Sequence, residues 1–175
     1  MDDSHSSFGA FQLPVGYHFR PTDEEVIEFF LLPRVLGRPL TPHLIHELDI
    51  FRYDPEQLPL DRDEEPKGWG YFFVFGKLGD EEGGGDGVRT TPAGYWKVQG
   101  AEKVIMDREE TETMGFMREM VFYRGKAPSE EKTDWVLEEY RLNPALSELK
   151  NPHDTKMDNC LLCSVHKENT QLDSD

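Results

Sequence analysis

The sequence predicts an α+β fold in which N-terminal helices flank an antiparallel β-sheet. The helical signals all lie before Trp69, whereas the later segments are short, rich in aromatic and β-branched residues, and typical of strands. The connections between those segments are short and contain Gly, Pro, Asp or Asn, which favour turns. Helices followed by a run of closely connected strands are typical of α+β proteins with an antiparallel sheet.

The first helix is predicted in the segment FRPTDEEVIEFFLLPRVLG. Thr22 as N-cap and Glu25 three positions later form a capping box, and acidic residues in the first turn suit a helix N-terminus. We expect Pro33 to end or kink this helix and Gly37 to close the segment. The segments TPHLIHELDIF and DPEQLP predict two short helical turns, and Asp54 begins the second.

Strands are predicted from Trp69 onward. WGYFFVF is followed by a glycine-rich polar loop, GKLGDEEGGGDG. Because Trp69, Trp96 and Trp135 each sit in an apolar strand pattern, we expect all three in the core. The remaining candidate strands are GYWKVQ, EKVIMD, GFMREMVFYRG, TDWVLEEYRL and NCLLCSVH.

Composition and charge restrict the classes of protein. The 175 residues are 37% hydrophobic and can bury one core, so we expect one domain. The sequence predicts no signal peptide and no membrane helix, and its two cysteines favour a reducing compartment. The net charge of −16 argues against nucleic-acid binding, but residues 86–126 hold seven basic and seven acidic side chains. DNA is therefore permitted as a partner of that region.

The stretch GYWKVQG, residues 94–100, lies in this neutral region and suggests a binding edge. Side chains alternate across a strand, so Trp96 and Val98 can enter a core while Tyr95, Lys97 and Gln99 project outward. A lysine neutralises phosphate, and a glutamine both donates to and accepts from an adenine edge. A solvated strand face is the plainer interpretation of the same pattern.

Five blocks in order resemble the NAC family of plant transcription factors. They are LPVGYHFRPTDEEV, IHELDIFRYDPEQLP, GWGYFFVF with GYWKVQGAEK, MVFYRGKAPSEEKTDWVLEEYRL, and LLCSVHK. The resemblance divides the chain into a flexible N-terminus (1–12), a DNA-binding and dimerisation domain (13–167) and a short polar tail (168–175). That tail is shorter than the activation region usual in the family.

The resemblance implies a twisted antiparallel sheet that acts as a dimer in the nucleus, with one strand end in the major groove of double-stranded DNA. No catalysis, cofactor, small-molecule substrate or membrane is expected. The DNA-binding residues are expected to be Arg89, Lys97, Gln99, Lys103, Arg118, Arg124 and Lys126. The interface of a homodimer, or of a heterodimer with other NAC proteins, is expected at Leu13, Pro14, Gly16, His18 and Glu25.

The chain departs from the family pattern at charged positions. Val98 and Gln99 replace the usual Ala-Thr, and Met117 and Arg118, followed by Glu119, replace a usual Lys-Lys pair. Several departures from the family pattern remove positive charge or add negative charge, so the alternative hypothesis is an interaction module that heterodimerises with and modulates other NAC factors without binding DNA well. His18 stands where the family usually has an arginine that pairs across the dimer with the matching Glu25.

Two further hypotheses are weaker. Cys160, Cys163 and His166 could mimic half of a zinc site, but a strand points positions three apart to opposite faces. The acidic run DREETE could supply paired carboxylates to an enzyme, but no catalytic motif accompanies it.

Overall fold

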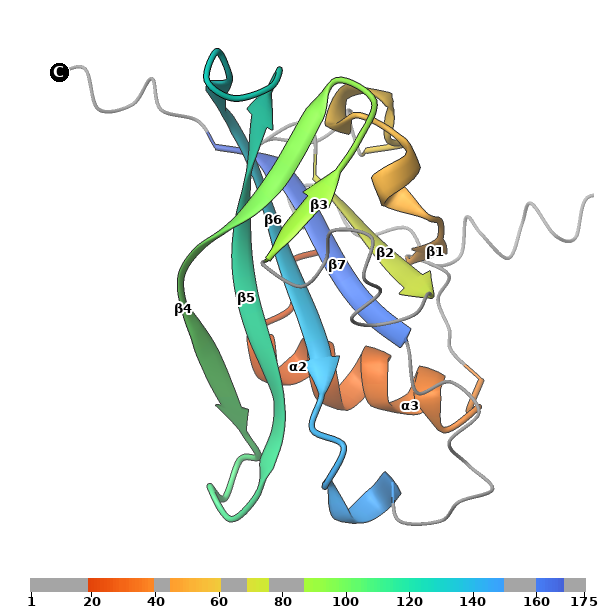
Figure 1. The fold of residues 1–175 in the computed structure, drawn as a ribbon. Helices are drawn as coiled ribbons and strands as arrows, with labels where there is room; N and C mark the ends of the chain where they lie inside the picture. Colours follow the sequence, from red (N-terminus) through yellow and green to blue (C-terminus); the bar gives the residue numbers. More distant parts are fainter. Residues whose placement is uncertain (1–18, 40–44, 61–68, 76–86, 150–159, 169–175) are drawn as a thin grey trace, which may run out of the picture.

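The computed structural model describes residues 19–39, 45–60, 69–75, 87–149 and 160–168. Within these residues one seven-stranded sheet forms the body of the molecule, with the order β1-β2-β7-β6-β5-β4-β3 (Figure 1). The strands are β1 (His46–Glu47), β2 (Gly70–Phe75), β3 (Val88–Thr90), β4 (Gly94–Met106), β5 (Thr113–Arg124), β6 (Glu131–Leu142) and β7 (Cys160–Lys167). None of the helices in these residues is long and apolar enough to cross a membrane.

The predicted α+β arrangement is confirmed in its main feature, a run of strands after N-terminal helical segments, but the sheet is mixed. β1 pairs with β2 in parallel, whereas all the other neighbouring strands are antiparallel. The exception arises because β1 comes from the N-terminal segment, where the sequence predicted only a helical turn. A long connection between β1 and β2 permits the parallel pairing that a tight hairpin forbids.

The predicted first helix forms from three consecutive elements, α2 (Asp23–Glu25), the π-helical η1 (Val26–Leu31) and α3 (Leu32–Val35). Its capping box is present, since Glu25 N–H donates to Thr22 Oγ1 at 3.2 Å and Thr22 N–H donates to Glu25 Oε1 at 2.8 Å. Of the two expected effects of Pro33, ending or kinking the helix, the structure excludes the first, because α3 continues to Val35. Pro33 lies in the first turn of α3, directly after the π-helical segment, where the hydrogen-bond register changes and its missing N–H is tolerated. Gly37 ends the segment with a φ of 76°.

The helix covers one face of the sheet, called the helix face below, because η1 contacts β5, β6 and β7. The 3-10 turns η2 (Ile50–Arg52) and η3 (Pro55–Gln57) pack on the opposite face, called the turn face. Each face carries its own apolar cluster. The helix-face cluster includes Ile27, Leu31, Phe73, Ile105, Tyr140, Cys160 and Leu162. The turn-face cluster includes Ile50, Phe72, Trp96, Phe122, Trp135, Leu137, Cys163 and Val165.

The predicted core tryptophans occupy both clusters. Trp96 and Trp135 are buried in the turn-face cluster, as expected. Trp69 is half-buried against the helix-face cluster, stacked on the His166 ring at 3.8 Å between centroids. Cys160 and Cys163 belong to clusters on opposite faces of β7, as the spacing predicted.

The segments GYWKVQ and EKVIMD, predicted as separate strands, form the single strand β4. Its pairing with β5 is irregular between Gln99 and Lys103, where Gly100 takes a φ of 79°. Only glycine adopts this backbone region readily, so Gly100 lets the strand continue through the irregularity. At Gly94 a Cβ atom would lie 2.0 Å from the Tyr123 carbonyl oxygen. Close packing of β4 on β5 therefore explains Gly94 without any ligand.

Candidate nucleic-acid interface

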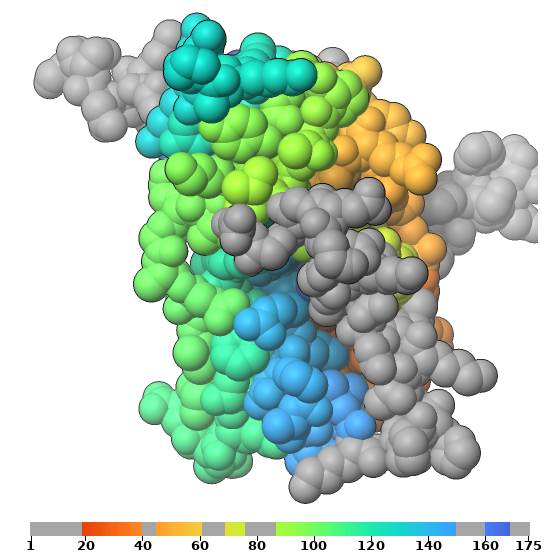
Figure 2. All heavy atoms as spheres, in the orientation of Figure 1, coloured from red at the N-terminus to blue at the C-terminus, as the bar shows by residue number. Residues whose placement is uncertain are grey.

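The outer edge of β4 is open along half of its length. β3 pairs with β4 only at residues 95–97, and the Val98 N–H then donates to the Gly87 carbonyl. Beyond Val98 no described strand covers this edge, and residues 99–104 are all exposed. Figure 1 shows β4 at the margin of the sheet, and Figure 2 shows its green residues along the side of the molecule. A protruding strand edge of this kind can enter a groove of another molecule.

The predicted alternation of side chains along β4 is confirmed. Trp96 is 1% exposed and packs on Phe122, with 5.1 Å between ring centroids. The Lys97 side chain is exposed and forms no hydrogen bond or ion pair with another described residue. Gln99 is exposed and its Nε2 donates to Glu119 Oε1 at 3.3 Å. The edge is thus anchored by a buried indole while its neighbouring polar side chains face outward.

Lys103 lies on the same edge but is paired. Its Nζ lies 2.5 Å from Asp23 Oδ2, at the start of the helix. This hydrogen bond and the Asp23 charge raise the pKa of Lys103. Asp23 also accepts a hydrogen bond of 2.7 Å from the Tyr140 hydroxyl, whose pKa is raised chiefly by burial. One carboxylate therefore joins α2, β4 and β6.

Arg89 and Arg118 share a buried acid on the turn face. Glu139 is 2% exposed, and its carboxylate lies 2.7 Å from Arg118 Nε and 3.4 Å from Arg89 Nη2. The Arg89 guanidinium also lies 5.0 Å from the centre of the Phe51 ring. These two arginines are engaged with β6 and η2, and the single Glu139 carboxylate neutralises half of their combined charge.

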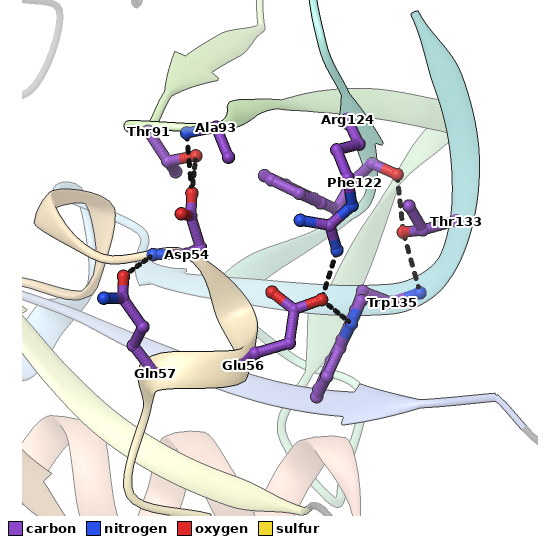
Figure 3. A network of polar contacts seen from close by, with 9 residues as sticks. All are labelled: Asp54, Glu56, Gln57, Thr91, Ala93, Phe122, Arg124, Thr133 and Trp135. Atoms are coloured by element: carbon purple, nitrogen blue, oxygen red, sulfur yellow. Dashed lines mark hydrogen bonds and ion pairs between the residues drawn. The ribbon is translucent and has the colours of Figure 1, made fainter.

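Arg124 is held at the other end of β5 by Glu56 of η3 (Figure 3). The same carboxylate accepts a hydrogen bond of 3.2 Å from Trp135 Nε1. Two residues earlier, Asp54 accepts from Thr91 Oγ1 at 2.7 Å and from Ala93 N–H at 2.9 Å, as Figure 3 shows. The short turn predicted from DPEQLP therefore ties the β3–β4 hairpin to the body of the sheet.

Six of the seven predicted DNA-binding residues thus divide into two groups. Lys97, Gln99 and Lys103 project from β4 on the helix-face side, whereas Arg89, Arg118 and Arg124 lie over the turn face. Lys126 is exposed after β5 and, like Lys97, has no charged partner among the described residues. The other cations are held by Asp23, Glu56 and Glu139, and the sequence carried no signal for these pairings.

The predicted dimer residues fall mainly outside the described part of the chain. Leu13, Pro14, Gly16 and His18 lie among residues 1–18, which the structure does not describe. Glu25 is described, and its carboxylate caps the helix through the Thr22 N–H. That contact explains Glu25 within one chain.

Comparisons with known proteins agree on one family. The family model for No apical meristem (NAM) protein matches residues 14–142. The NAC domain-containing protein 2 of Solanum lycopersicum is 35% identical over 159 residues, which cover 89% of this chain and 55% of that protein. NAC transcription factor 29 of Arabidopsis thaliana is 35% identical over 159 residues, covering 89% and 57%. The NAC domain-containing protein JA2 of Solanum lycopersicum is 37% identical over 158 residues, covering 90% and 44%. The chain spans about half the length of the curated relatives it matches.

Proposed function

This chain belongs to the NAC family of plant transcription regulators, and from that premise we propose that it binds specific sequences of duplex DNA through the edge of β4. The observation that carries the proposal is the exposed outer part of β4, where the Lys97 side chain has no ion-pair partner among the described residues and Gln99 points outward beside a buried Trp96. The role requires no catalysis and no cofactor, and it places the protein in the nucleus.

The two-stranded form of the β3–β4 hairpin suits the major groove. The groove of B-DNA is about 12 Å wide and admits a two-stranded β-ribbon. β3 and β4 form such a ribbon, which Asp54 fixes to η3 through two hydrogen bonds. The hairpin backbone is therefore already ordered before binding. Little conformational entropy is lost when the edge enters the groove.

Within this proposal the cations have different roles. Lys97 and Lys126, which are exposed and unpaired among the described residues, contact phosphates. Gln99 reads a base edge. Lys103 and Arg124 reach DNA only by leaving Asp23 and Glu56. The loss of these ion pairs reduces the binding free energy that each cation contributes. Arg89 and Arg118 stay on Glu139 and stabilise the fold beneath the edge.

Selection of bound sequences from a library of random duplex DNA, with the full chain, tests this function. We expect an enriched motif together with modest affinity, because a net charge of −16 opposes the approach of a polyanion. Recovery of random sequences only, at 50 mM and at 150 mM salt, would show that the chain does not read DNA by itself.

We further propose that the chain dimerises through residues 13–19, in line with the dimers implied by the family. A chain lacking residues 1–18 retains every described residue, including Arg20, whose guanidinium lies 4.0 Å from the centre of the Trp69 ring, so we expect it to fold as the full chain does. We expect light scattering to find a dimer for the full chain and a monomer for the shortened chain. A shortened chain that stays dimeric would place the interface elsewhere.

A further inference from the structure

A row of four polar side chains crosses the sheet beside the proposed DNA-binding edge. The register pairs Gln99 with Glu119, Glu119 with Glu138, and Glu138 with Ser164, on strands β4, β5, β6 and β7. Side chains directly opposite each other on one face of a sheet lie close enough to interact. The orientation of the Gln99 side-chain amide therefore depends on its neighbours in this row.

The row fixes which end of the Gln99 amide faces inward. A carboxylate only accepts hydrogen bonds, so the amide nitrogen must point to Glu119, and the contact is 3.3 Å from Nε2 to Oε1. The Oε1 atom of Gln99 and its second N–H have no partner among the residues that the structure describes. A bidentate contact with adenine uses one acceptor and one donor of this kind, for the N6 amino group and N7.

Glu138, the second acid in the row, also favours the contact between Glu119 and Gln99. Glu138 stands opposite Glu119 on the side away from Gln99, and its Oε1 accepts a hydrogen bond of 3.0 Å from Ser164 Oγ. Like charges placed directly opposite each other repel, which favours the Glu119 carboxylate on the Gln99 side. Glu119 thus has a hydrogen-bond donor on one side and a like charge on the other.

We propose that Glu119 is a positioning residue that holds Gln99 for adenine in the major groove. This inference rests on the proposed function of the β4 edge. It gives Glu119 a role in sequence preference that is separate from its general repulsion of DNA. A residue that acts only through its charge changes affinity for all duplexes alike, whereas a positioning residue changes the ranking of bases at one position.

The test uses the full chain and the duplex selected from the random library. The Gln99→Ala variant is used first to identify the base pair that Gln99 reads. That base pair is the position of the motif at which the variant no longer prefers one base over the others. Four duplexes, one for each base at that position, are then titrated with wild type, Glu119→Met and Glu119→Gln. Methionine removes the acceptor at similar length, whereas glutamine removes the charge and keeps an acceptor oxygen.

We expect Glu119→Met to reduce the preference for adenine by about 5-fold or more, the low end for a bidentate contact. Glu119→Gln should keep most of the preference while it tightens binding to all four duplexes. In the Gln99→Ala background, Glu119→Met should not change the base ranking further. Equal melting temperatures establish that the variants are folded.

Three results would overturn the inference. If both Glu119 variants tighten all four duplexes equally and leave the adenine preference intact, Glu119 acts by charge alone. If Gln99→Ala alters no position of the motif, Gln99 reads no base. If wild type selects no motif, the proposed function fails first, and the inference fails with it.

Discussion

Trp96→Ala should lower the free energy of unfolding by about 3–5 kcal/mol, as replacement of a buried aromatic side chain by alanine does. Trp96 is 1% exposed and lies in the turn-face cluster against Phe122. The change would remove the indole that anchors the proposed DNA-binding edge of β4, so both stability and the position of the edge depend on it. Urea denaturation followed by circular dichroism measures the loss.

The control for this change is the next residue in the strand. Lys97→Ala alters an exposed side chain on the opposite side of β4, and we expect its unfolding curve to match that of wild type. If the Trp96 and Lys97 variants unfold at the same urea concentration, the core does not rest on Trp96 and the assignment of the two sides of β4 is wrong.

Glu139→Gln should also destabilise the fold strongly, because two arginines share this one buried carboxylate. Removing one partner of a fully buried ion pair costs about 3–5 kcal/mol. The arginine side chains are 21% and 25% exposed, so water compensates part of the loss, and we expect about 2–3 kcal/mol. Thermal and urea unfolding of the variant measure this value.

A matched surface pair provides the control. Glu102 Oε2 lies 2.9 Å from Arg141 Nη2, and the two side chains are 39% and 36% exposed. Glu102→Gln should change the unfolding free energy by only about 0–1 kcal/mol, the usual range for exposed pairs. Equal effects of the Glu102 and Glu139 substitutions would contradict the structural role given to Arg89 and Arg118.

Features set by neighbouring residues could be predicted from the sequence. The Thr22–Glu25 capping box depends on four consecutive positions, and the alternation of Trp96 and Lys97 depends only on the period of a strand. Both were predicted and both form. The Asp54 turn forms for the same reason, with a reciprocal hydrogen bond between its N–H and Gln57.

Features set by strand register could not be predicted. The acid that holds Arg124 lies 68 residues away, and the acid that holds Lys103 lies 80 residues away. These pairs require the sheet order, the irregularity between Gln99 and Lys103, and the packing of the helix and η3 on opposite faces. The sequence therefore predicted six basic DNA-binding candidates, together with Gln99, without showing which of them are already paired within the chain.

The most direct test of the β4 edge as a DNA-binding surface is the salt dependence of duplex binding by Lys97→Ala. Each phosphate contact contributes about −0.9 to the slope of log Kobs against log salt concentration. We expect Lys97→Ala to weaken binding to selected and scrambled duplexes alike and to make the slope less negative by about 0.9. Arg38→Ala is the control, since Arg38 is an exposed cation that follows α3 in the sequence, and Figure 1 shows α3 away from the β3–β4 hairpin; this variant should leave the slope unchanged. An unchanged slope for Lys97→Ala, or an equal change for Arg38→Ala, would contradict the placement of the β4 edge against DNA.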